Sequence, residues 1–254
     1  MIQNIKVAVT MPAFNAAKYI EDALASLLRQ RADAKLDIIV VDDGSTDGTP
    51  DVVRRLGAQA PEIRLVERAN GGVAAARNSA LAAITPDTDL VTALDADDLS
   101  PPGRFDRDIA HFTADPDLDV LYASMRAFRG PAHDQLQPVA DSEQIDLRGV
   151  QLGALMMRRV LAERIGPFDE TLRQCEDVDY FFRMFQLAPK TKLSDEISVY
   201  YRRHEGNITR DRQTAVAAFR QSAMRHAVRV RKGGAPVPPG FFDPRAFSAL
   251  VEWW

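Results

Sequence analysis

LDIIVVDDGSTD, at residues 36–47, is the stretch that decides the fold. Residues 36–41 form a dense, mostly apolar run with no room for a solvent-facing side, which is typical of a strand covered on both faces in a parallel sheet. Asp, Gly and Ser then supply the turn residues that a tight bend between a strand and a helix needs. The stretch therefore predicts a buried strand, an acidic loop and a helix, in that order.

The same order recurs on either side of this stretch. Strands and helices alternating at this spacing predict βαβ units with right-handed crossovers, so we expect an α/β fold with a mostly parallel central sheet flanked by helices. The expected strands of the first half are 5–10, 36–41, 63–66 and 90–94, and the expected helices are 17–30, 50–57 and 73–84.

The second half has a less regular pattern. We expect one domain over residues 1–205, made of halves 1–100 and 101–205, followed by a basic helix and an aromatic tail over 206–254. Residues 130–144 show little pattern and indicate a polar loop. The other expected elements are strands at 120–128, 152–157 and 197–202 and helices at 104–114, 159–165, 177–187 and 207–232.

Composition excludes several classes of protein. A chain of 254 residues with 46% hydrophobic and 27% charged residues can bury a large core and is neither disordered nor collagen-like. Its net charge of −4 gives no reason to expect nucleic-acid binding. The single cysteine, Cys175, excludes an internal disulfide framework and a CxxC zinc site, and no run reaches the roughly 18 apolar residues of a membrane span. Because residues 1–10 also lack the pattern of a secretion signal, we expect a cytoplasmic protein.

Polar clusters follow three of the expected strands at their carboxyl ends, where ligands bind in open α/β sheets. Since the carboxyl ends of parallel strands share one edge of the sheet, we expect one shared site. The clusters lie at residues 12–15, 42–47 and 95–98.

The cluster Asp95-Ala96-Asp97-Asp98 has two interpretations. Three carboxylates this close repel one another unless they share a cation. Mg²⁺ and Mn²⁺ prefer oxygen ligands and are often completed by phosphates and water, so the cluster favours metal-assisted handling of a diphosphate. The alternative is an acidic helix start in which Asp98 or Ser100 caps the helix that follows. The residues alone support both interpretations equally.

Two further motifs leave alternatives open. The aspartates of residues 42–47 suit either a turn capped by Asp47 or Thr49, or recognition of the imide N–H of a uracil ring. Asn70-Gly71-Gly72 precedes a helix whose dipole, together with Arg77, suits a phosphate group. The alternative is a small-residue helix packed tightly on the sheet, with Arg77 at its surface.

A carboxylate opens the helix expected at 177–187. Asp177 would be stabilised there by the helix dipole, and it would act as a general base if a substrate hydroxyl reached it. Capping of this helix by Glu176 or Asp177 is the alternative that the residues alone favour. Cys175 has no nearby histidine in the sequence, which favours a buried structural thiol over a nucleophile.

These motifs follow one another in a fixed order along the chain. They are Met11-Pro12-Ala13-Phe14-Asn15; Ile39-Val40-Val41-Asp42-Asp43-Gly44-Ser45-Thr46-Asp47; Asn70-Gly71-Gly72 with Ala76-Arg77-Asn78; Leu94-Asp95-Ala96-Asp97-Asp98; and Gly166-Pro167-Phe168-Asp169-Glu170 with Glu176-Asp177. In this order they resemble the family 2 glycosyltransferases, which are inverting enzymes of the GT-A fold that move sugars from nucleotide diphosphates. The resemblance covers roughly residues 4–205, and repeated helix capping would not produce such an ordered set.

The resemblance implies a role for each matching residue on the donor side. Arg77 would lie near the pyrophosphate, and Asn70 and Gly71 would line the same nucleotide-sugar site. Asp95 and Asp97 form the DXD element with Ala96 between them. The residues that would hold the uridine are Pro12, Ala13, Phe14, Asn15, Asp42 and Asp43.

Metal and catalytic roles are carried over in the same way. Asp97 resembles the direct metal ligand, and Asp95 a ribose contact or an indirect metal contact, with Asp98 beside them. Asp177 matches the catalytic base of the family's Glu-Asp pair, next to Glu176. His204 falls where some members supply a further contact to the metal or the diphosphate, and a surface histidine in a basic loop is the equal alternative.

The implied function is a metal-dependent, inverting glycosyltransferase that uses Mn²⁺ or Mg²⁺. It would move a hexosyl or N-acetylhexosaminyl group from a nucleotide-diphosphate sugar, with UDP preferred, to an acceptor hydroxyl in cell-surface glycan or polysaccharide assembly. Residues 1–100 would bind the donor, and residues 101–205 would bind the acceptor and carry the base. Processive synthases of the family carry Gln-x-x-Arg-Trp, and the nearest string here, at 221–226, has neither the spacing nor the Trp. This departure implies transfer of a single sugar.

Two other functions compete with this one. A non-catalytic nucleotide-sugar-binding protein would keep the same binding residues without turnover. A sugar-phosphate nucleotidyltransferase would need a Gly-rich loop after its first strand, and residues 10–15 contain no glycine. The second alternative is therefore the weaker one.

The sequence does not name the acceptor, which can be a glycan, a lipid-linked sugar or a protein and should be recognised by residues 125–151. Residues 202–232 hold nine Lys or Arg against Glu205 and Asp211. This basic stretch suits anionic lipid head groups or a polyprenyl-diphosphate acceptor at the membrane surface. The alternative is a solvated helix packed on the domain through Val216, Phe219, Met224 and Val228. The aromatic tail at 238–254 would fold back, pack in a homodimer or touch a membrane.

Overall fold

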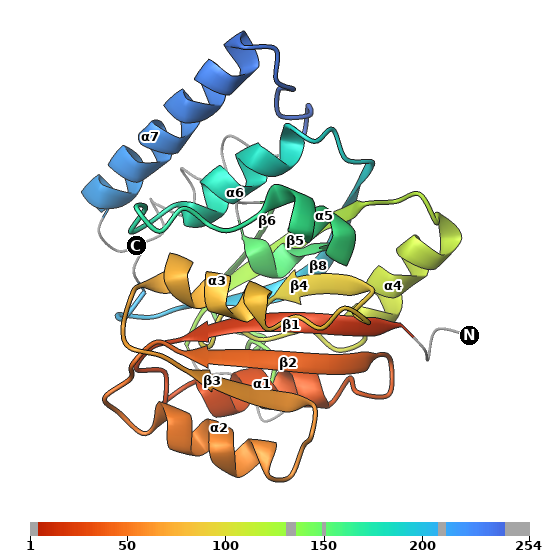
Figure 1. Cartoon of the computed structure of the whole chain (residues 1–254). Helices are drawn as coiled ribbons and strands as arrows, with labels where there is room; N and C mark the ends of the chain where they lie inside the picture. Colours follow the sequence, from red (N-terminus) through yellow and green to blue (C-terminus); the bar gives the residue numbers. More distant parts are fainter. Residues whose placement is uncertain (1–4, 131–135, 149–150, 208–211, 242–254) are drawn as a thin grey trace.

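The computed structural model describes residues 5–130, 136–148, 151–207 and 212–241. Over these ranges the chain forms one eight-stranded sheet flanked by helices (Figure 1). The strands lie in the order β3-β2-β1-β4-β7-β5-β6, and β8 pairs with β5. The expected α/β class with a mostly parallel central sheet is confirmed.

The first half of the chain forms the parallel part of the sheet. β1 (Lys6–Ala13), β2 (Lys35–Asp42), β3 (Ile63–Glu67) and β4 (Leu90–Ala93) are connected by α1 (Ile20–Leu28), α2 (Thr49–Gly57) and α3 (Val73–Ala82). α1 and α2 contact each other, whereas α3 packs on β1 and β2 from the opposite face, in front of the sheet in Figure 1. The strand order reverses between β1 and β4, so ligands are expected at the carboxyl ends of these strands.

The second half adds antiparallel strands to this sheet. β7 (Leu155–Arg158) lies antiparallel between β4 and β5 (Val120–Arg129), and β6 (Gln144–Leu147) pairs antiparallel with β5. β8 (Thr191–Arg203) runs parallel to β5 along most of its length. The helices of this half are α4 (Arg104–Ala114), α5 (Arg159–Ile165), α6 (Glu176–Phe185) and α7 (Arg212–Arg231).

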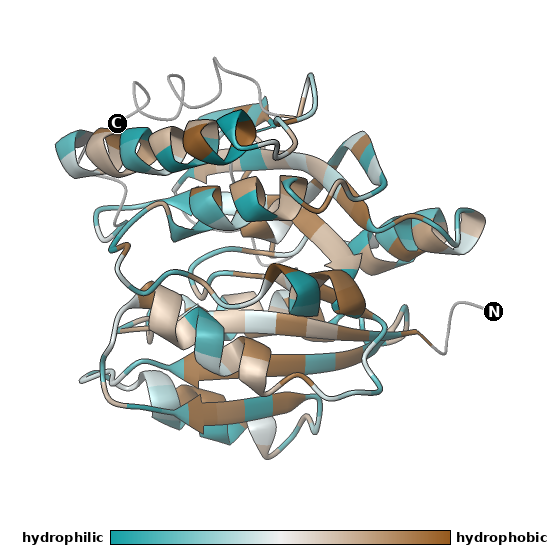
Figure 2. Ribbon diagram, turned by 45° about the horizontal axis from the view of Figure 1, so that its top comes forward, coloured by the Kyte–Doolittle hydropathy of each residue, from teal (hydrophilic) through white to brown (hydrophobic). Residues whose placement is uncertain are grey.

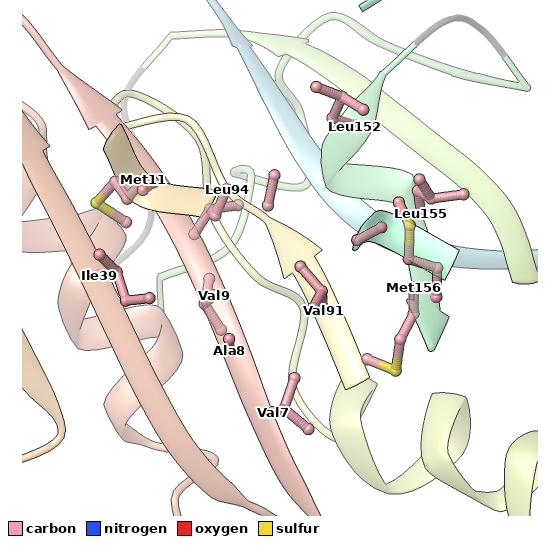
Figure 3. Packing of buried hydrophobic residues seen from close by; sticks show 14 of the residues in the cluster. Val7, Ala8, Val9, Met11, Ile39, Val91, Leu94, Leu152, Leu155 and Met156 are labelled. Carbon is pink, nitrogen blue, oxygen red and sulfur yellow. The ribbon is translucent and has the colours of Figure 1, made fainter. Parts of the chain in front are cut away.

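One apolar cluster joins the two halves. Figure 3 shows it around Val9 of β1, Val91 of β4 and Met156 of β7, and Figure 2 shows much of the parallel sheet in brown, the colour of hydrophobic residues. Each fully buried aliphatic side chain of this kind stabilises the fold by roughly 1.5–3 kcal/mol. β2 is buried on both faces as expected, and Asp37, the acidic residue in its run, pairs with Arg64 at 2.7 Å. The core therefore fixes the strand ends that carry the polar clusters.

Several elements of the second half differ from the sequence-based expectation. Residues 152–157 do not form one strand, because Leu152–Ala154 is a 3₁₀ turn in which the Gln151 side chain accepts the Gly153 N–H. Residues 131–135 of the expected polar loop at 130–144 lie outside the described ranges, and its last residue, Gln144, begins β6. The pairing of β6 with β5 supplies order that the side chains do not signal. The last strand starts at Thr191 rather than 197 for the same reason. The helix expected at 207–232 is described as Arg212–Arg231, and residues 208–211 lie outside the described ranges.

α7 packs on α6 through only part of the apolar face that the sequence indicated. Met224 is 70% exposed and Val228 is 49% exposed, so their expected role in packing is wrong. Phe219 packs against the main apolar cluster, as expected. Ion pairs add to this packing, because Arg225 contacts Asp169 and Arg229 contacts Asp179. None of the helices that the structure describes is long and apolar enough to cross a bilayer. Of the aromatic tail, the structure describes residues up to 241, and Phe241 is folded back into the core.

Candidate active site

The loops after β1 and β2 form one unit at the carboxyl edge of the sheet. The Asn15 N–H donates to Ser45 Oγ at 2.9 Å, and Asn15 Oδ1 accepts the Thr46 N–H at 2.8 Å. The Asp43 N–H donates to the Ala13 carbonyl at 2.8 Å. Asn15 has a positive φ of 50°, which turns the chain so that Phe14 stays 52% exposed at this edge. The structure thus brings residues 12–15 and 42–47 together.

Asp42 and Asp43 are both buried at the end of β2, and they have different partners. Asp42 Oδ2 accepts the Ser45 N–H at 3.2 Å, whereas its buried Oδ1 accepts no hydrogen bond from any residue that the structure describes. Asp43 accepts the N–H groups of Gly71 and Gly72 at 3.0 and 2.7 Å and lies 3.4 Å from Arg68 Nε. Asp42 therefore has an acceptor atom available for a ligand, while Asp43 anchors the loop before α3.

Asp47 caps the turn before α2, which was one of the two roles expected for it. Its Oδ1 accepts the N–H and the hydroxyl of Thr49 at the start of α2, and its Oδ2 accepts the Ala17 N–H at 3.1 Å. These hydrogen bonds hold the pKa of Asp47 below its usual value despite partial burial. Asp47 thus fixes the acidic loop to the start of α2 and to residue 17.

The start of α3 depends on glycine. Gly72 is the N-cap residue with φ 90°, which a side chain rarely permits. Gly44 has φ 74°, and a Cβ there would lie 2.8 Å from the Asn70 backbone nitrogen. The two glycines let the β2 loop and the β3 loop approach closely at the N-terminus of α3, where the helix dipole favours an anion.

Arg77 connects the two carboxylate clusters. Its Nη2 donates to Asp95 Oδ1 at 3.0 Å, and its Nε donates to Glu176 Oε1 at 3.1 Å. Burial opposes its charge, but Asp95, Glu176 and Asp177 outweigh this and raise the pKa of Arg77. Its buried Nη1 has no hydrogen-bond acceptor within the described parts of the chain. The expectation of a surface arginine is wrong, and Nη1 remains a donor for an anionic ligand.

Asp97 and Asp98 point to different surroundings. Asp97 Oδ2 lies 2.8 Å from His204 Nε2 and accepts from Asn207 Nδ2 at 3.2 Å. Asp98 is fully buried and accepts the Arg202 N–H at 2.9 Å and the Gln151 side-chain amide at 3.1 Å. Burial, followed by the nearby Asp97 and Asp95, raises the pKa of Asp98 well above its usual range. The capping alternative is wrong, because α4 has Gly103 as its N-cap without a side-chain hydrogen bond.

A loop after β8 completes this side of the site. Asn207 Oδ1 accepts the His204 N–H at 2.7 Å, and the His204 ring lies 4.4 Å from the Tyr19 ring. Arg202 lies between the rings of Tyr19 and Phe128 and donates through Nε to the Asp97 carbonyl at 3.0 Å. His204 is therefore a partner of Asp97 and not an isolated surface histidine.

The donor set suits a cation that a diphosphate completes. Among the described residues there is no group of three or more His, Cys, Asp and Glu side chains that could hold a metal ion by itself. Asp97 and His204 provide one carboxylate and one imidazole at 2.8 Å from each other. Mg²⁺ and Mn²⁺ are commonly held by one or two protein ligands together with substrate phosphates and water, so these two residues fit such an ion.

Asp177 lies in the first turn of α6, next to the Arg77 network. It is partly buried, and its Oδ1 accepts the Val178 N–H at 2.7 Å. Burial and the neighbouring Glu176 raise the pKa of Asp177 to about 7, against the lowering effect of Arg77. The N-cap of α6 is Cys175 with φ 58°, and it makes no side-chain capping bond. The carboxylate of Glu176 accepts a hydrogen bond from Arg77 Nε.

The loop before α6 is held by a residue that the sequence analysis quoted without a role. Asn78 Oδ1 accepts the Phe168 N–H at 2.7 Å, and its Nδ2 donates to the Phe168 carbonyl at 3.0 Å and to Glu170 at 2.7 Å. Asn78 follows Arg77 in the sequence, so α3 orients both Arg77 and the loop over residues 166–170. The polar Arg-Asn pair in an otherwise small-residue helix was the available signal.

Comparison with known proteins identifies the family. The model of glycosyl transferase family 2 matches residues 8–174, well over half of the chain. The chain belongs to glycosyltransferase family 2. An uncharacterized glycosyltransferase of Nostoc sp. is 29% identical over 216 residues, which cover 80% of this chain and 66% of that protein. The succinoglycan biosynthesis protein ExoU of Rhizobium meliloti is 32% identical over 205 residues, which cover 74% of this chain and 59% of ExoU.

Solved structures show that this family 2 member has the GT-A fold expected from its motifs. S. aureus TarS 1–349 in complex with UDP-GlcNAc matches with a TM-score of 0.70 and 24% identity, covering 88% of this chain and 66% of that one. The mannosyltransferase PcManGT from Pyrobaculum calidifontis, in complex with GDP-Man and Mn²⁺, matches with a TM-score of 0.64 and 24% identity, covering 91% and 65%. This chain thus spans about two thirds of the length of such proteins.

Two residues of this glycosyltransferase domain were missed from the sequence. Arg202 and Asn207 both contact Asp97, and both lie within the string Arg202-Arg203-His204-Glu205-Gly206-Asn207 after the last strand. From the sequence, only His204 of this string was assigned a role. A polar and basic cluster directly after a buried strand was the signal, because strand ends carry ligand-binding residues in this class of sheet.

Proposed function

We propose that this chain is an inverting glycosyltransferase that moves a single sugar from a nucleotide-diphosphate sugar to an acceptor hydroxyl, in glycan or polysaccharide assembly. The observation that carries the proposal is the link from Asp177 to the DXD element: Glu176, Arg77 and Asp95 are joined by contacts of 3.1 and 3.0 Å. Asp177, adjacent to Glu176 in the sequence, has a pKa raised to about 7, and in this proposal its neighbours Arg77 and Asp95 would handle a diphosphate. The membership in family 2 and the likeness to ExoU support the same class of function.

The donor in this proposal is a UDP-sugar of the hexosyl or N-acetylhexosaminyl class. Asp42 Oδ1 is a buried acceptor at the end of β2, where the imide N–H of uracil would donate to it. Asp43 would act indirectly, by holding Asn70, Gly71 and Gly72 at the N-terminus of α3. The proteins with similar folds bind different nucleotide sugars, UDP-GlcNAc in TarS and GDP-Man in PcManGT, so both nucleotides belong in a test.

Asp97 and His204 would hold the divalent cation, with Asp95 next to them. When bound, Mn²⁺ or Mg²⁺ would neutralise charge on the departing diphosphate. Arg77 would donate to the same diphosphate through Nη1, the atom without an acceptor among the described residues. Arg202 and Asn207 would keep Asp97 and His204 in place.

Asp177 would be the catalytic base. Its carboxylate takes the proton of the acceptor hydroxyl as that oxygen bonds to the anomeric carbon from the face opposite the diphosphate. The bond from the anomeric carbon to the diphosphate oxygen breaks, and its electron pair leaves with the diphosphate. The configuration at the anomeric carbon is thereby inverted. A base with a pKa near 7 has the right strength for this proton transfer at neutral pH.

The deciding experiment measures nucleotide release from a panel of UDP-, dTDP- and GDP-sugars with Mn²⁺, Mg²⁺ or EDTA. Slow, metal-dependent hydrolysis of one donor is expected without an acceptor. Asp177→Asn should lower sugar transfer by roughly 100- to 10,000-fold while UDP binding is kept. Asp87→Asn is the matched control, because Asp87 pairs with Lys6 at the opposite end of the sheet.

Three outcomes would count against the proposal. Equal loss of UDP binding and transfer in Asp177→Asn would remove the base assignment. Tight UDP binding without any turnover would favour a non-catalytic nucleotide-sugar-binding protein. Formation of a nucleotide sugar from a nucleoside triphosphate and a sugar phosphate would favour a nucleotidyltransferase.

We propose further that the outer face of α7 contacts an anionic membrane surface, where a lipid-linked acceptor would be met. α7 contains no acidic residue, and its exposed positions include Arg220, Arg231, Met224 and Val228. Basic side chains beside exposed apolar ones are typical of helices that bind in the plane of a membrane. The ion pairs with Asp169 and Asp179 leave this outer face turned away from the domain.

A further inference from the structure

Phe241 follows α7 and packs against the helix that carries Asp177. Its side chain is fully buried. The ring stacks on Tyr122 of β5 at a centroid distance of 4.3 Å and meets Phe185 of α6 edge-on at 4.5 Å. One aromatic side chain from the end of the described chain therefore fills the space between β5 and α6.

The face of α6 that Phe241 supports is the face that carries Asp177. Asp177, Phe181 and Phe185 are spaced by four residues, which places them on one side of a helix. Phe181 lies 5.3 Å from the Tyr122 ring and 5.8 Å from the Phe241 ring. The aromatic group of Tyr122, Phe181, Phe185 and Phe241 thus lies one to two helical turns behind Asp177.

Two side chains bind the backbone of the segment between α7 and Phe241. The Gln186 side chain, just past the end of α6, donates to the Ala235 carbonyl at 2.8 Å. Arg148 donates to the Gly240 carbonyl at 3.4 Å, next to Phe241. The segment is therefore held at residue 235 and again at residue 240, directly before Phe241.

We infer that Phe241 is a positioning residue for the catalytic base: its ring sets the distance between α6 and β5 and so holds Asp177 facing the donor site. The inference rests on the proposed function. Core side chains pack as densely as an organic crystal, so removal of this ring shifts or loosens α6. A displacement of about 1 Å of a catalytic group can cost roughly 100-fold in rate.

The position of Phe241 changes where the catalytic domain ends along the chain. The sequence suggested a glycosyltransferase domain ending near residue 205, followed by an appendage. With Phe241 between α6 and β5, and with Arg229 paired to Asp179 of α6, the catalytic unit extends at least to residue 241. A chain shortened after residue 207 would therefore keep Asn207 beside Asp97 and His204 and lose the placement of its base.

The test compares Phe241→Ala and Phe241→Leu with the same substitutions at Phe105. Phe105 is equally buried but lies on α4, so it controls for lost packing in general. In Phe241→Ala we expect kcat for sugar transfer to fall roughly 10- to 100-fold while the Kd for UDP is unchanged. Phe241→Leu should restore part of kcat, because it refills the space without the ring. The Phe105 variants should lower the melting temperature and leave kcat unchanged.

A second measurement does not depend on activity. Cys175 is the single cysteine of the chain and the N-cap of α6, next to Asp177, and its burial and the adjacent carboxylates raise its pKa to about 12. Its thiol should therefore react slowly with a disulfide reagent such as DTNB. Loosening of α6 in Phe241→Ala and Phe241→Leu should speed this reaction, and the Phe105 variants should not.

The outcomes separate the two proposals. If the wild-type protein transfers sugar, and the Phe241 variants match the Phe105 variants in both kcat and thiol reactivity, the positioning role is wrong. If the wild-type protein transfers no sugar while the Phe241 variants speed the thiol reaction, the proposed function fails and the contact between Phe241 and α6 stands. Phe241→Leu keeps the test decisive if Phe241→Ala does not fold.

Discussion

The carboxyl ends of β2 and β8 hold their functional side chains in different ways. At β2, Asp43 accepts N–H groups from Gly71 and Gly72 in the loop after β3. β3 is the strand that pairs with β2 within the βαβ part of the fold. At β8, Arg202 and His204 contact Asp97, which is 105 and 107 residues away along the chain. The side proposed to bind uridine is thus built from neighbouring units, whereas the contacts of the side proposed to bind a metal form only when β8 has joined the sheet.

Binding of the nucleotide and binding of the metal should therefore respond to different mutations. Residues at β2 should affect UDP binding with or without a cation. Residues at β4 and β8 should affect the increment that a cation adds.

Asp97→Ala should remove the effect of Mn²⁺ on UDP binding. The substitution deletes the carboxylate that lies 2.8 Å from His204 and leaves the β2 loops untouched. Loss of a ligand oxygen to a divalent ion should weaken Mn²⁺-dependent UDP binding by roughly 10- to 100-fold or more. Calorimetry with Mn²⁺ and with EDTA should give the same weak Kd in this variant.

Two variants complete that experiment. Asp43→Ala should weaken UDP binding by a similar factor in Mn²⁺ and in EDTA, because the loop at residues 70–72 loses its anchor. Asp106→Ala, on the exposed face of α4, should change neither. A metal effect of normal size in Asp97→Ala would contradict the assignment of Asp97 as a ligand.

The pH dependence of transfer should follow Asp177. A base must be deprotonated, and the pKa of this carboxyl is raised to about 7, so kcat should rise with pH and level off above 7. Below that pH the rate should fall about tenfold per unit. A profile measured at saturating donor that is flat between pH 5 and 8 would contradict a base with this pKa.

The same raised pKa predicts an effect on stability, measured without metal or donor. Because the pKa of Asp177 is higher in the folded chain than in the unfolded chain, folding favours the protonated form. Stability is therefore greatest below about pH 4 with respect to this group and is lost as the pH rises toward 7. Asp177→Asn should be more stable than wild type by roughly 1–3 kcal/mol at pH 8, with a smaller difference at pH 5. Urea unfolding at the two pH values gives the comparison.

Elements with a regular local pattern of apolar residues could be predicted from the sequence, and elements without one could not. α4 and α5 match their expected bounds, and β2 was predicted from its apolar run, because burial on both faces of a parallel strand leaves a plain local pattern. β6 was missed, since its pairing with β5 depends on contacts such as Arg126–Asp146 that no local pattern encodes.

The same reason applies to the candidate site. Asp42, Asp95, Asp97 and Asp177 could be found because each follows a strand or opens a helix within a recognisable motif. Their partners Arg202 and Asn207 could not be assigned, because their role depends on the parallel pairing of β8 with β5 and on the approach of β8 to residues 97–99. The buried place of Phe241 was equally invisible in a tail with many aromatic residues.

Arg202→Lys should have a smaller effect on the metal side. The lysine keeps the charge but loses the flat guanidinium between Tyr19 and Phe128 and the second contact, to Asp22 at 3.3 Å. We expect the free energy of unfolding to fall by about 1–3 kcal/mol and Mn²⁺-dependent UDP binding to weaken several-fold. Arg203→Lys is the control, since adjacent side chains of β8 point to opposite faces. It should lower stability without changing the metal effect, and equal effects of the two variants on the metal would contradict a specific role for Arg202.

The smallest expected effect concerns α7, which lies outside both halves of the site. The protein should sediment with phosphatidylglycerol vesicles at low salt and not with phosphatidylcholine vesicles, because Arg220, Arg231 and the exposed Met224 and Val228 share the outer face of α7.

Met224→Glu with Val228→Glu should weaken this binding roughly fivefold or more, since each added charge opposes the anionic surface. Ala110→Glu with Ala114→Glu, on exposed positions of α4, adds the same charge elsewhere and should have little effect. Equal binding by both double variants would remove the membrane contact, and a dimer that the α7 variant converts to a monomer would assign this face to a second copy of the chain.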